Sequence, residues 1–542
     1  MSEFQFVAAI INRPYCRAGR CTNKAMCLVK GFRLHTVKVS ISLAVLTLGV
    51  FATDALRASG TEGAAAVETR YSGRAGISLS LSACQLEDSA KVSSVEAQCG
   101  EFSVLENPAD PTSRRIGLRV ARVPAINRHS QPDPLFVLAG GPGMAATTFY
   151  ASAAMPFERI HRDRDVVLVD QRGTGQSNAL NCALDENTVY GGSDAQVVAD
   201  TQRCLAELEK KAHVEFYTTS IAVRDLDAVR AALGYQRINL YGVSYGTRVA
   251  QHYARRFAEH TRSVILDGVV PPQLALGPST SVNAEQALGR IFARCATDAA
   301  CRKHFGDPTE SYRQLRSSLQ QQAVPVTLAD PTTGEGSRFE FMSYHFATVL
   351  RLGSYTAEQA ALLPLMLHVA TASANFTPLV SQFLLVNHSY SDAVAYGMHN
   401  SVVCSEDVPF WDLSKLDRDE LAKTYLGTAP VDGLKSICSV WPRGPVDADF
   451  HSPLKTDIPM LLLSGSDDPV TPPADAEEAR RGFVHSAHIV LQGFGHGQIT
   501  AVCVDKVMAS FISLGSVDGL DTSCVNNDRP MPFFLTLSGP AP

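Results

Sequence analysis

The sequence lacks the features of several large classes of protein. Its 542 residues carry a formal charge of −6, and beyond roughly the first sixty residues there is no basic surplus, so a nucleic-acid partner is not expected. Glycine and proline, 38 and 29 residues, are close to average usage, which excludes collagen-like and low-complexity chains. Since 45% of the residues are hydrophobic, the sequence predicts a folded chain with a large core.

Signals for metal and cofactor sites are also missing. No Cys-x-x-Cys pair occurs, and the cysteines are spread along the chain rather than grouped with histidines, so a zinc site is not indicated. The glycine-rich segment at 140–143 is not followed by Gly-Lys-Ser/Thr, which disfavours a phosphate-binding loop. We therefore expect neither a metal nor a cofactor.

The beginning of the chain differs from the rest. Lys30, Arg33 and Lys38 precede an apolar run at 39–52, and small alanines follow it. A run of this length is short for a membrane span but suits the core of a signal peptide, so residues 1–58 are predicted to be an export leader. The alternative is that the apolar run is not cleaved and anchors the chain in a membrane. After cleavage no stable membrane insertion is expected, and the protein would be secreted or periplasmic.

Cysteine usage supports export independently. Ten cysteines follow the leader, and taken in order they form five local couples. These couples are Cys84/Cys99, Cys182/Cys204, Cys295/Cys301, Cys404/Cys438 and Cys503/Cys524. In an oxidising compartment such bridges would each contribute roughly 2–4 kcal/mol, so we interpret the couples as disulfides.

The pattern of apolar residues changes along the chain. Between 76 and 125 short alternating runs predict antiparallel strands, after which continuous aliphatic runs predict a parallel sheet with helical crossovers. The parallel strands are expected at 135–141, 165–171, 238–244, 263–268, 460–468 and 488–496. Because the alternation of strand and helix is missing from about 270 to 455, a mainly helical insertion is predicted there. The predicted segments are 1–58 (leader), 70–270 (first part of the core), 271–455 (cap) and 456–542 (second part of the core).

The strongest motif is Gly-x-Ser-x-Gly at 242–246, which follows a buried strand and precedes a helical run. A sharp strand-to-helix turn needs small residues two positions before and after the nucleophile, so that the serine hydroxyl is exposed. We therefore predict that Ser244 is a catalytic nucleophile rather than part of an ordinary glycine turn.

A serine hydroxyl needs a histidine base, and the base needs a carboxylate that fixes its tautomer. His496 has glycine on both sides at the end of a predicted strand, and Asp468 ends the strand before it, 28 residues earlier. Asp467 competes with Asp468, which is favoured because Pro469 can fix the turn. His485 and His488 are the nearby alternatives to His496.

The oxyanion of a tetrahedral intermediate needs preorganised N–H donors. The segment AGGPGM follows the first parallel strand, so the N–H groups of Gly141 and of Tyr245 are the predicted pair. The loop VDQRGTGQS at 169–177 is expected to shape the site, with Asp170 and Arg172 paired with each other.

These segments together resemble the proline iminopeptidase and tripeptidyl aminopeptidase branch of the α/β-hydrolases. The likeness lies in GGPG, DQRGTGQS, GVSYGTRVA, GSDDPVTPP and GFGHG, which span about 140 to 500. The resemblance implies an α/β-hydrolase fold, which is a mostly parallel sheet flanked by helices, with a large, mainly helical cap inserted before the strand that carries the catalytic acid. It also implies a triad of Ser244, Asp468 and His496. Ala139 stands where proline iminopeptidases usually have histidine, so a strict proline preference is not implied.

Aminopeptidases of this branch bind a free α-ammonium, which calls for a carboxylate in the cap. Glu406 and Asp407 in CSEDVPFW are the candidates, and a helix cap or a solvated acidic pair is the alternative. The expected substrate is a peptide or a small acyl compound. The favoured hypothesis is that the protein is an exported exopeptidase, and the second hypothesis is an esterase with the same triad.

Overall fold

The computed structural model describes residues 69–72, 78–182 and 192–540. By its internal contacts the chain divides into Met1–Ala65 and Ala66–Pro542, and all described residues belong to the second unit. The predicted leader and signal peptide therefore lie outside the described residues. Among the helices described, none has the length and apolar character that crossing a membrane requires.

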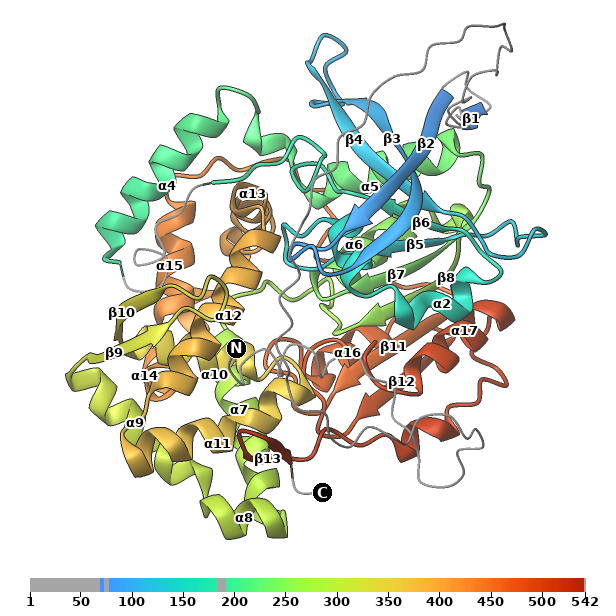
Figure 1. Cartoon of the computed structure of the whole chain (residues 1–542). Coiled ribbons are helices and arrows are strands. Elements are labelled where there is room, and N and C mark those ends of the chain that lie inside the picture. The colour runs from blue at the N-terminus through green and yellow to red at the C-terminus, as the bar shows by residue number, and fades with distance from the viewer. Residues whose placement is uncertain (1–68, 73–77, 183–191, 541–542) are drawn as a thin grey trace, which may run out of the picture. The chain divides into compact units, whose positions relative to one another are not determined.

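Ten described strands form one sheet in the order β1-β2-β3-β4-β6-β5-β7-β8-β11-β12 (Figure 1). The first four strands pair antiparallel, and the strands from β6 to β12 in this order run parallel to one another. Their bounds are Thr69–Ser72 (β1), Ser78–Glu87 (β2), Ser94–Leu105 (β3), Arg115–Val123 (β4), Leu135–Leu138 (β5), Val166–Val169 (β6), Ile238–Val243 (β7), Thr261–Asp267 (β8), Met460–Gly465 (β11) and Ser486–Leu491 (β12).

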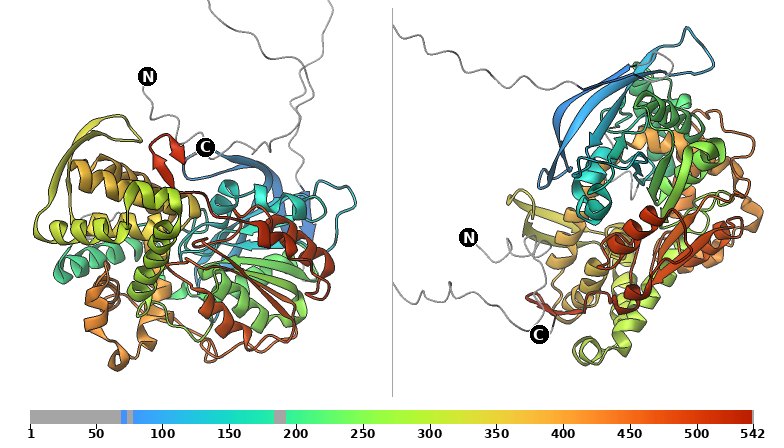
Figure 2. Two further views of the ribbon diagram at one scale, coloured as in Figure 1. Left: turned by 90° about the horizontal axis from the view of Figure 1, so that it is seen from below. Right: turned by 90° about the vertical axis from the view of Figure 1, so that its right-hand side faces the viewer.

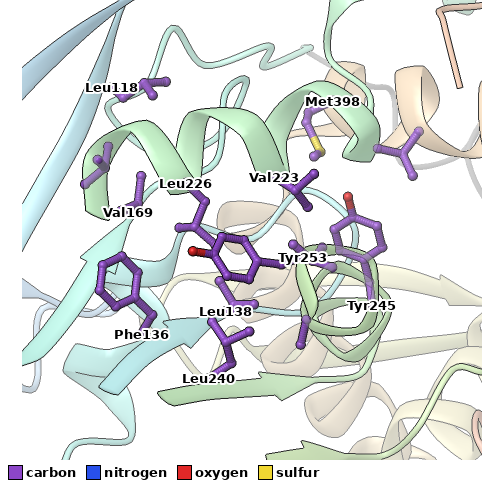
Figure 3. Close-up of a cluster of buried hydrophobic side chains, with 14 of the residues drawn as sticks. Leu118, Phe136, Leu138, Val169, Val223, Leu226, Leu240, Tyr245, Tyr253 and Met398 are labelled. Atoms are coloured by element: carbon purple, nitrogen blue, oxygen red, sulfur yellow. The ribbon is translucent and has the colours of Figure 1, made fainter. Parts of the chain in front are cut away.

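Helices cover both faces of this sheet, which is why the central strands are continuous apolar runs. Successive side chains of a strand point to opposite faces, so Phe136 and Leu138 join one buried cluster while Leu135 and Val137 join another. The covering helices are Ala146–Ser152 (α1), Glu158–His161 (α2), Thr219–Ala232 (α5), Tyr245–Arg256 (α6), Pro473–Arg480 (α16) and Val504–Leu514 (α17). The helix Asp194–Leu208 (α4) packs instead against the helices at 396–406 and 429–438. Figure 3 shows part of the first cluster, where α5 and α6 pack over the strands.

The segment between β8 and β11, here called the insertion, has a separate buried cluster that includes Phe292, Phe346 and Leu367. Its helices lie together beside the sheet in Figures 1 and 2. They are Thr280–Thr297 (α7), Ala299–Phe305 (α8), Pro308–Gln321 (α9), Ser343–Gly353 (α10), Ala357–Ser373 (α11), Thr377–Ala393 (α12), Tyr396–Glu406 (α13), Arg418–Lys423 (α14) and Ala429–Cys438 (α15), with a strand pair at Val324–Ala329 (β9) and Gly336–Phe341 (β10).

The predicted fold class is thereby confirmed, because a mostly parallel sheet lies between helices and a mainly helical insertion precedes the strand that carries the acid. The boundaries of the four predicted segments stay predictions. A short strand pair, Phe534–Thr536 (β13) and Gly539–Pro540 (β14), lies near the end of the chain.

All five predicted cysteine couples are disulfides. Their Cα–Cα distances lie between 5.1 and 6.0 Å, within the usual range for a disulfide. The bridge of Cys84 and Cys99 joins β2 to β3, and the bridge of Cys404 and Cys438 joins α13 to α15. The pairing was predictable because each bridge closes a short segment of chain.

The predicted pair of Asp170 and Arg172 is wrong. Arg172 is fully buried and donates to both carboxylate oxygens of Asp225 on α5, from Nε at 2.6 Å and from Nη2 at 2.8 Å. Asp170 instead accepts hydrogen bonds from Thr147 and from the N–H of Gln176. A guanidinium buried between the sheet and α5 needs a bidentate carboxylate, and Asp225 offers one in the right plane.

Removing one partner of this buried pair should cost far more stability than removing an exposed one. We expect Arg172→Ala to lower the free energy of unfolding by about 3–5 kcal/mol, because Asp225 would be left buried and uncompensated. Arg162 is the matched control, since its side chain is 62% exposed and lies 3.7 Å from Glu158, and Arg162→Ala should cost about 0–1 kcal/mol. Urea unfolding followed by circular dichroism measures both, and equal losses would contradict the assignment.

Candidate active site

Ser244 occupies the turn between β7 and α6, with φ of 56° and ψ of −125°. This backbone conformation is strained for any residue with a side chain, and it is typical of functional sites. A Cβ on Gly242 would lie 2.3 Å from the carbonyl oxygen of Gly246, and a Cβ on Gly246 would lie 2.4 Å from that of Leu138. The glycines of the motif are therefore required for the chain to pass through this turn.

His496 and Asp468 meet at the edge of the sheet where the parallel strands end, here called the carboxyl edge. The Nδ1 atom of His496 lies 2.8 Å from Oδ2 of Asp468. Asp468 is fully buried and accepts three further hydrogen bonds, from the N–H of Val470 and from the N–H and hydroxyl of Thr471, at 2.7 to 2.9 Å. The carboxylate is thus fixed, and the Nε2 atom of the ring faces away from it.

The alternatives to these two residues lie elsewhere. Asp467 faces Arg290 and Arg294 at 3.8 Å and accepts from the Ser466 hydroxyl. His488 lies on β12, where its ring contacts Glu477 and, at 3.0 Å, the hydroxyl of Ser464. Of the two aspartates, Asp468 is the one that contacts His496.

Ser244 lies at the same carboxyl edge as this pair. Its N–H donates to the backbone carbonyl of Asp267 at 2.8 Å, and the Asp267 carboxylate accepts from the N–H of Gln498, two residues after His496. Among the described residues no hydrogen bond joins the Ser244 hydroxyl to the His496 ring. In hydrolases without substrate this contact is often long, and it shortens in the complex.

The glycine-rich turn after β5 passes directly over the serine. A Cβ on Gly140 would lie 3.1 Å from Cβ of Ser244 and 3.7 Å from its Oγ. Gly141 has φ of 109°, and Tyr245 is the first residue of α6, so its N–H has no partner within the helix. Within the described chain neither N–H donates a hydrogen bond, so both predicted oxyanion donors are available.

The Tyr245 side chain leads away from the carboxyl edge through a buried chain of hydrogen bonds. Its hydroxyl accepts from Nε2 of Gln171 at 3.0 Å and contacts Oγ1 of Thr219, which in turn donates to Glu406 at 2.8 Å. The Tyr245 ring itself packs in the apolar cluster of Figure 3. These contacts anchor the first turn of α6 and with it the Tyr245 N–H.

Glu406 and Asp407 are both fully buried. Glu406 accepts from the N–H and hydroxyl of Thr219, and burial raises its pKa to about 7. Asp407 accepts from Arg248 at 2.9 Å and from the N–H of Leu276 at 2.8 Å through the same oxygen. Its other oxygen, Oδ2, has no hydrogen-bond partner among the described residues. The α-ammonium role predicted for these carboxylates stays a prediction.

Sequence reasoning missed two groups that hold the histidine loop. The N–H of His496 donates to the backbone carbonyl of Tyr355, in the turn between α10 and α11, at 2.6 Å, and the two rings meet edge to face. Asp267 holds the same loop from β8. The strand ending in Asp267 was predicted, but nothing in its pattern indicated a role at the site, and the Tyr355 contact arises from the tertiary fold alone.

The described residues contain no group of three or more His, Cys, Asp or Glu side chains that could hold a metal ion.

Comparisons with known proteins agree with the geometry. A family model described as "alpha/beta hydrolase fold" matches residues 133–339, and one described as "TAP-like protein" matches 423–524. Serine protease Hip1 of Mycobacterium tuberculosis is 24% identical over 477 residues, covering 79% of this chain and 87% of the relative. Tripeptidyl aminopeptidase of Streptomyces lividans is 25% identical over 477 residues, covering 80% and 85%. Among solved structures, proline iminopeptidase of Mycobacterium smegmatis aligns over 77% of this chain and 98% of its own chain, with 15% sequence identity and a TM-score of 0.34. This TM-score is too low to guide the interpretation of the site.

The His496 and Asp468 pair predicts a specific pH dependence. Burial alone would lower the pKa of His496, but the Asp468 carboxylate, with Asp267 behind it, raises this pKa above the usual 6.5. Only the neutral imidazole can accept a proton from Ser244, so we expect kcat/KM to fall on acidification with a midpoint above pH 6.5. Asp468→Asn should lower kcat by roughly 10⁴-fold. Profiles of rate against pH measure both effects, and a midpoint below 6.5 in the unmodified protein would contradict the assignment.

Proposed function

We propose that this chain, a serine hydrolase similar to the TAP-like α/β-hydrolases, is an exported peptidase that cleaves peptide bonds near a free N-terminus. The observation that carries the proposal is the pair of His496 and Asp468, at 2.8 Å, on the same edge of the sheet as Ser244 in its strained turn. This constellation supports acyl transfer through a serine nucleophile.

The proposed reaction proceeds through an acyl-enzyme. The Ser244 oxygen attacks the substrate carbonyl carbon while Nε2 of His496 accepts the hydroxyl proton, and Asp468 stabilises the imidazolium. The N–H groups of Gly141 and Tyr245 bind the oxyanion of the tetrahedral intermediate. As the carbon–nitrogen bond breaks, His496 returns the proton to the leaving amine. Water then attacks the acyl carbon while His496 accepts its proton, and the imidazolium returns a proton to the Ser244 oxygen as the acyl bond breaks.

The preference for a free N-terminus is supported by the similarity to a relative named tripeptidyl aminopeptidase. Binding an α-ammonium in a site that excludes water calls for a carboxylate. Of the two predicted carboxylates, Glu406 already has a donor at each oxygen, whereas Oδ2 of Asp407 lacks one in the described structure. Within the pair, Asp407 is therefore the better candidate for this role.

Export is supported by the five disulfides, because such bonds persist in oxidising compartments and are rare in the cytosol. The predicted leader at 1–58 supplies a route out of the cytoplasm.

The role of the nucleophile can be tested by covalent labelling. A fluorophosphonate should label the native protein at one residue, because it reacts with an activated serine, and Ser244→Ala should abolish labelling together with hydrolysis. Ser466 is a matched control on the same edge, since its hydroxyl bonds Asp467 rather than His496, and Ser466→Ala should still be labelled. Labelling that persists in Ser244→Ala would refute the nucleophile.

The substrate class can be tested with paired chromogenic peptides. We expect a peptide with a free amine to be cleaved at least tenfold faster, in kcat/KM, than the same peptide acetylated, because an ammonium bound to a carboxylate contributes roughly 1.5–3 kcal/mol. Equal rates on the two peptides, with faster cleavage of short acyl esters, would favour the esterase instead.

A further inference from the structure

A second buried carboxylate, that of Asp267, lies at the carboxyl edge behind the candidate triad. Asp267 is the last residue of β8 and is fully buried. Both of its carboxylate oxygens lie 2.8 Å from the N–H of Gln498, and Oδ2 also accepts from the Tyr241 hydroxyl at 2.8 Å. Both of its hydrogen-bond partners among the described residues are donors, and such bonds favour the ionised form.

The backbone of the same residue holds the nucleophile. The carbonyl oxygen of Asp267 accepts the N–H of Ser244 at 2.8 Å. The next residue, Gly268, passes so close to the base that a Cβ there would lie 3.2 Å from Nδ1 of His496. Asp267 therefore contacts the strained turn through its backbone and the histidine loop through its side chain.

The charged and titratable groups around Asp267 come from three elements. Tyr241 faces it from β7, Asp468 from the loop after β11, and His496 from the loop after β12. Burial raises the pKa of Asp267 to about 6, while its hydrogen bonds and His496 act against this and Asp468 acts with it. Above that pH the charge of Asp267 adds to that of Asp468 in raising the pKa of His496, whereas Arg351 on α10 acts to lower it.

We propose that Asp267 is a positioning residue that holds the histidine loop against the Ser244 turn and places a second negative charge behind the His496 ring. This inference rests on the proposed triad. An asparagine would serve poorly in its place, because its amide hydrogens would face the Gln498 N–H, which is itself a donor.

The decisive variant is Asp267→Asn, assayed per mole of folded protein. We expect kcat to fall by about 10- to 100-fold with KM changed less than about threefold, because a misplaced base slows chemistry more than binding. The acid limb of the kcat/KM profile should also move to lower pH, since the charge that raises the pKa of His496 is lost.

Asp165 provides a matched control at the opposite edge of the sheet. It precedes β6, and its carboxylate likewise accepts one backbone N–H, from Ala125 at 2.8 Å, and one tyrosine hydroxyl, from Tyr235 at 2.7 Å, but it also pairs with Arg122 at 3.4 Å. Asp165→Asn should lower the melting temperature but leave kcat and the pH profile unchanged. If Asp267→Asn behaves in the same way, the proposal is overturned.

Should Asp267→Asn fail to fold, Tyr241→Phe decides the matter. It removes one donor to the carboxylate but keeps the ring that packs against Phe157 at 4.9 Å. We expect a smaller loss of kcat and a smaller shift of the acid limb in the same direction, and a native profile would overturn the proposal. Failure of the triad itself is distinguishable, because fluorophosphonate would then still label Ser244→Ala.

Discussion

The active site depends on one backbone constraint, namely that Ser244 occupies a conformation that residues with side chains avoid. Strain of this kind costs roughly 1–3 kcal/mol and persists only where the surroundings determine it. Here β7 and β8 hold the turn from below, and the Asp267 carbonyl accepts the Ser244 N–H. The glycines at 242, 246 and 140 allow neighbouring backbone to approach. The parallel sheet is thus what holds the half-buried Ser244 at its edge.

Buried charge is the second constraint on this site. Asp468 and Asp267 are both fully buried, yet each accepts hydrogen bonds from backbone N–H groups and hydroxyls. Such donors offset the loss of hydration without neutralising the carboxylate. Asp407 differs, because the Arg248 guanidinium compensates it directly. The carboxylates near His496 therefore keep their negative charge available to the imidazole, whereas Asp407 is paired with a cation through Oδ1.

Much of this fold could be predicted from the sequence, because the informative signals are local. Continuous apolar runs place β5, β7 and β11 correctly, and the five disulfides follow from cysteines that are neighbours along the chain. The partner of Arg172 could not be predicted, since Asp225 is 53 residues away and several acids were available. The same holds for Tyr355 and Asp267, whose contacts with the histidine loop join elements far apart in sequence. Sequence patterns report which faces are buried, but they do not report which side chains meet there.

The insertion contacts the candidate site through several of its residues. The Tyr355 carbonyl accepts the His496 N–H, and Glu406 bonds Thr219 beneath the ring of Tyr245. The N–H of Ala395 donates to the carbonyl of Gly143 at 3.0 Å, so the oxyanion turn is held as well. The base and both predicted oxyanion donors are thus each held by a segment of the insertion as well as by the sheet. A change in the insertion that moves Tyr355, Ala395 or Glu406 is therefore expected to move these groups of the candidate site as well.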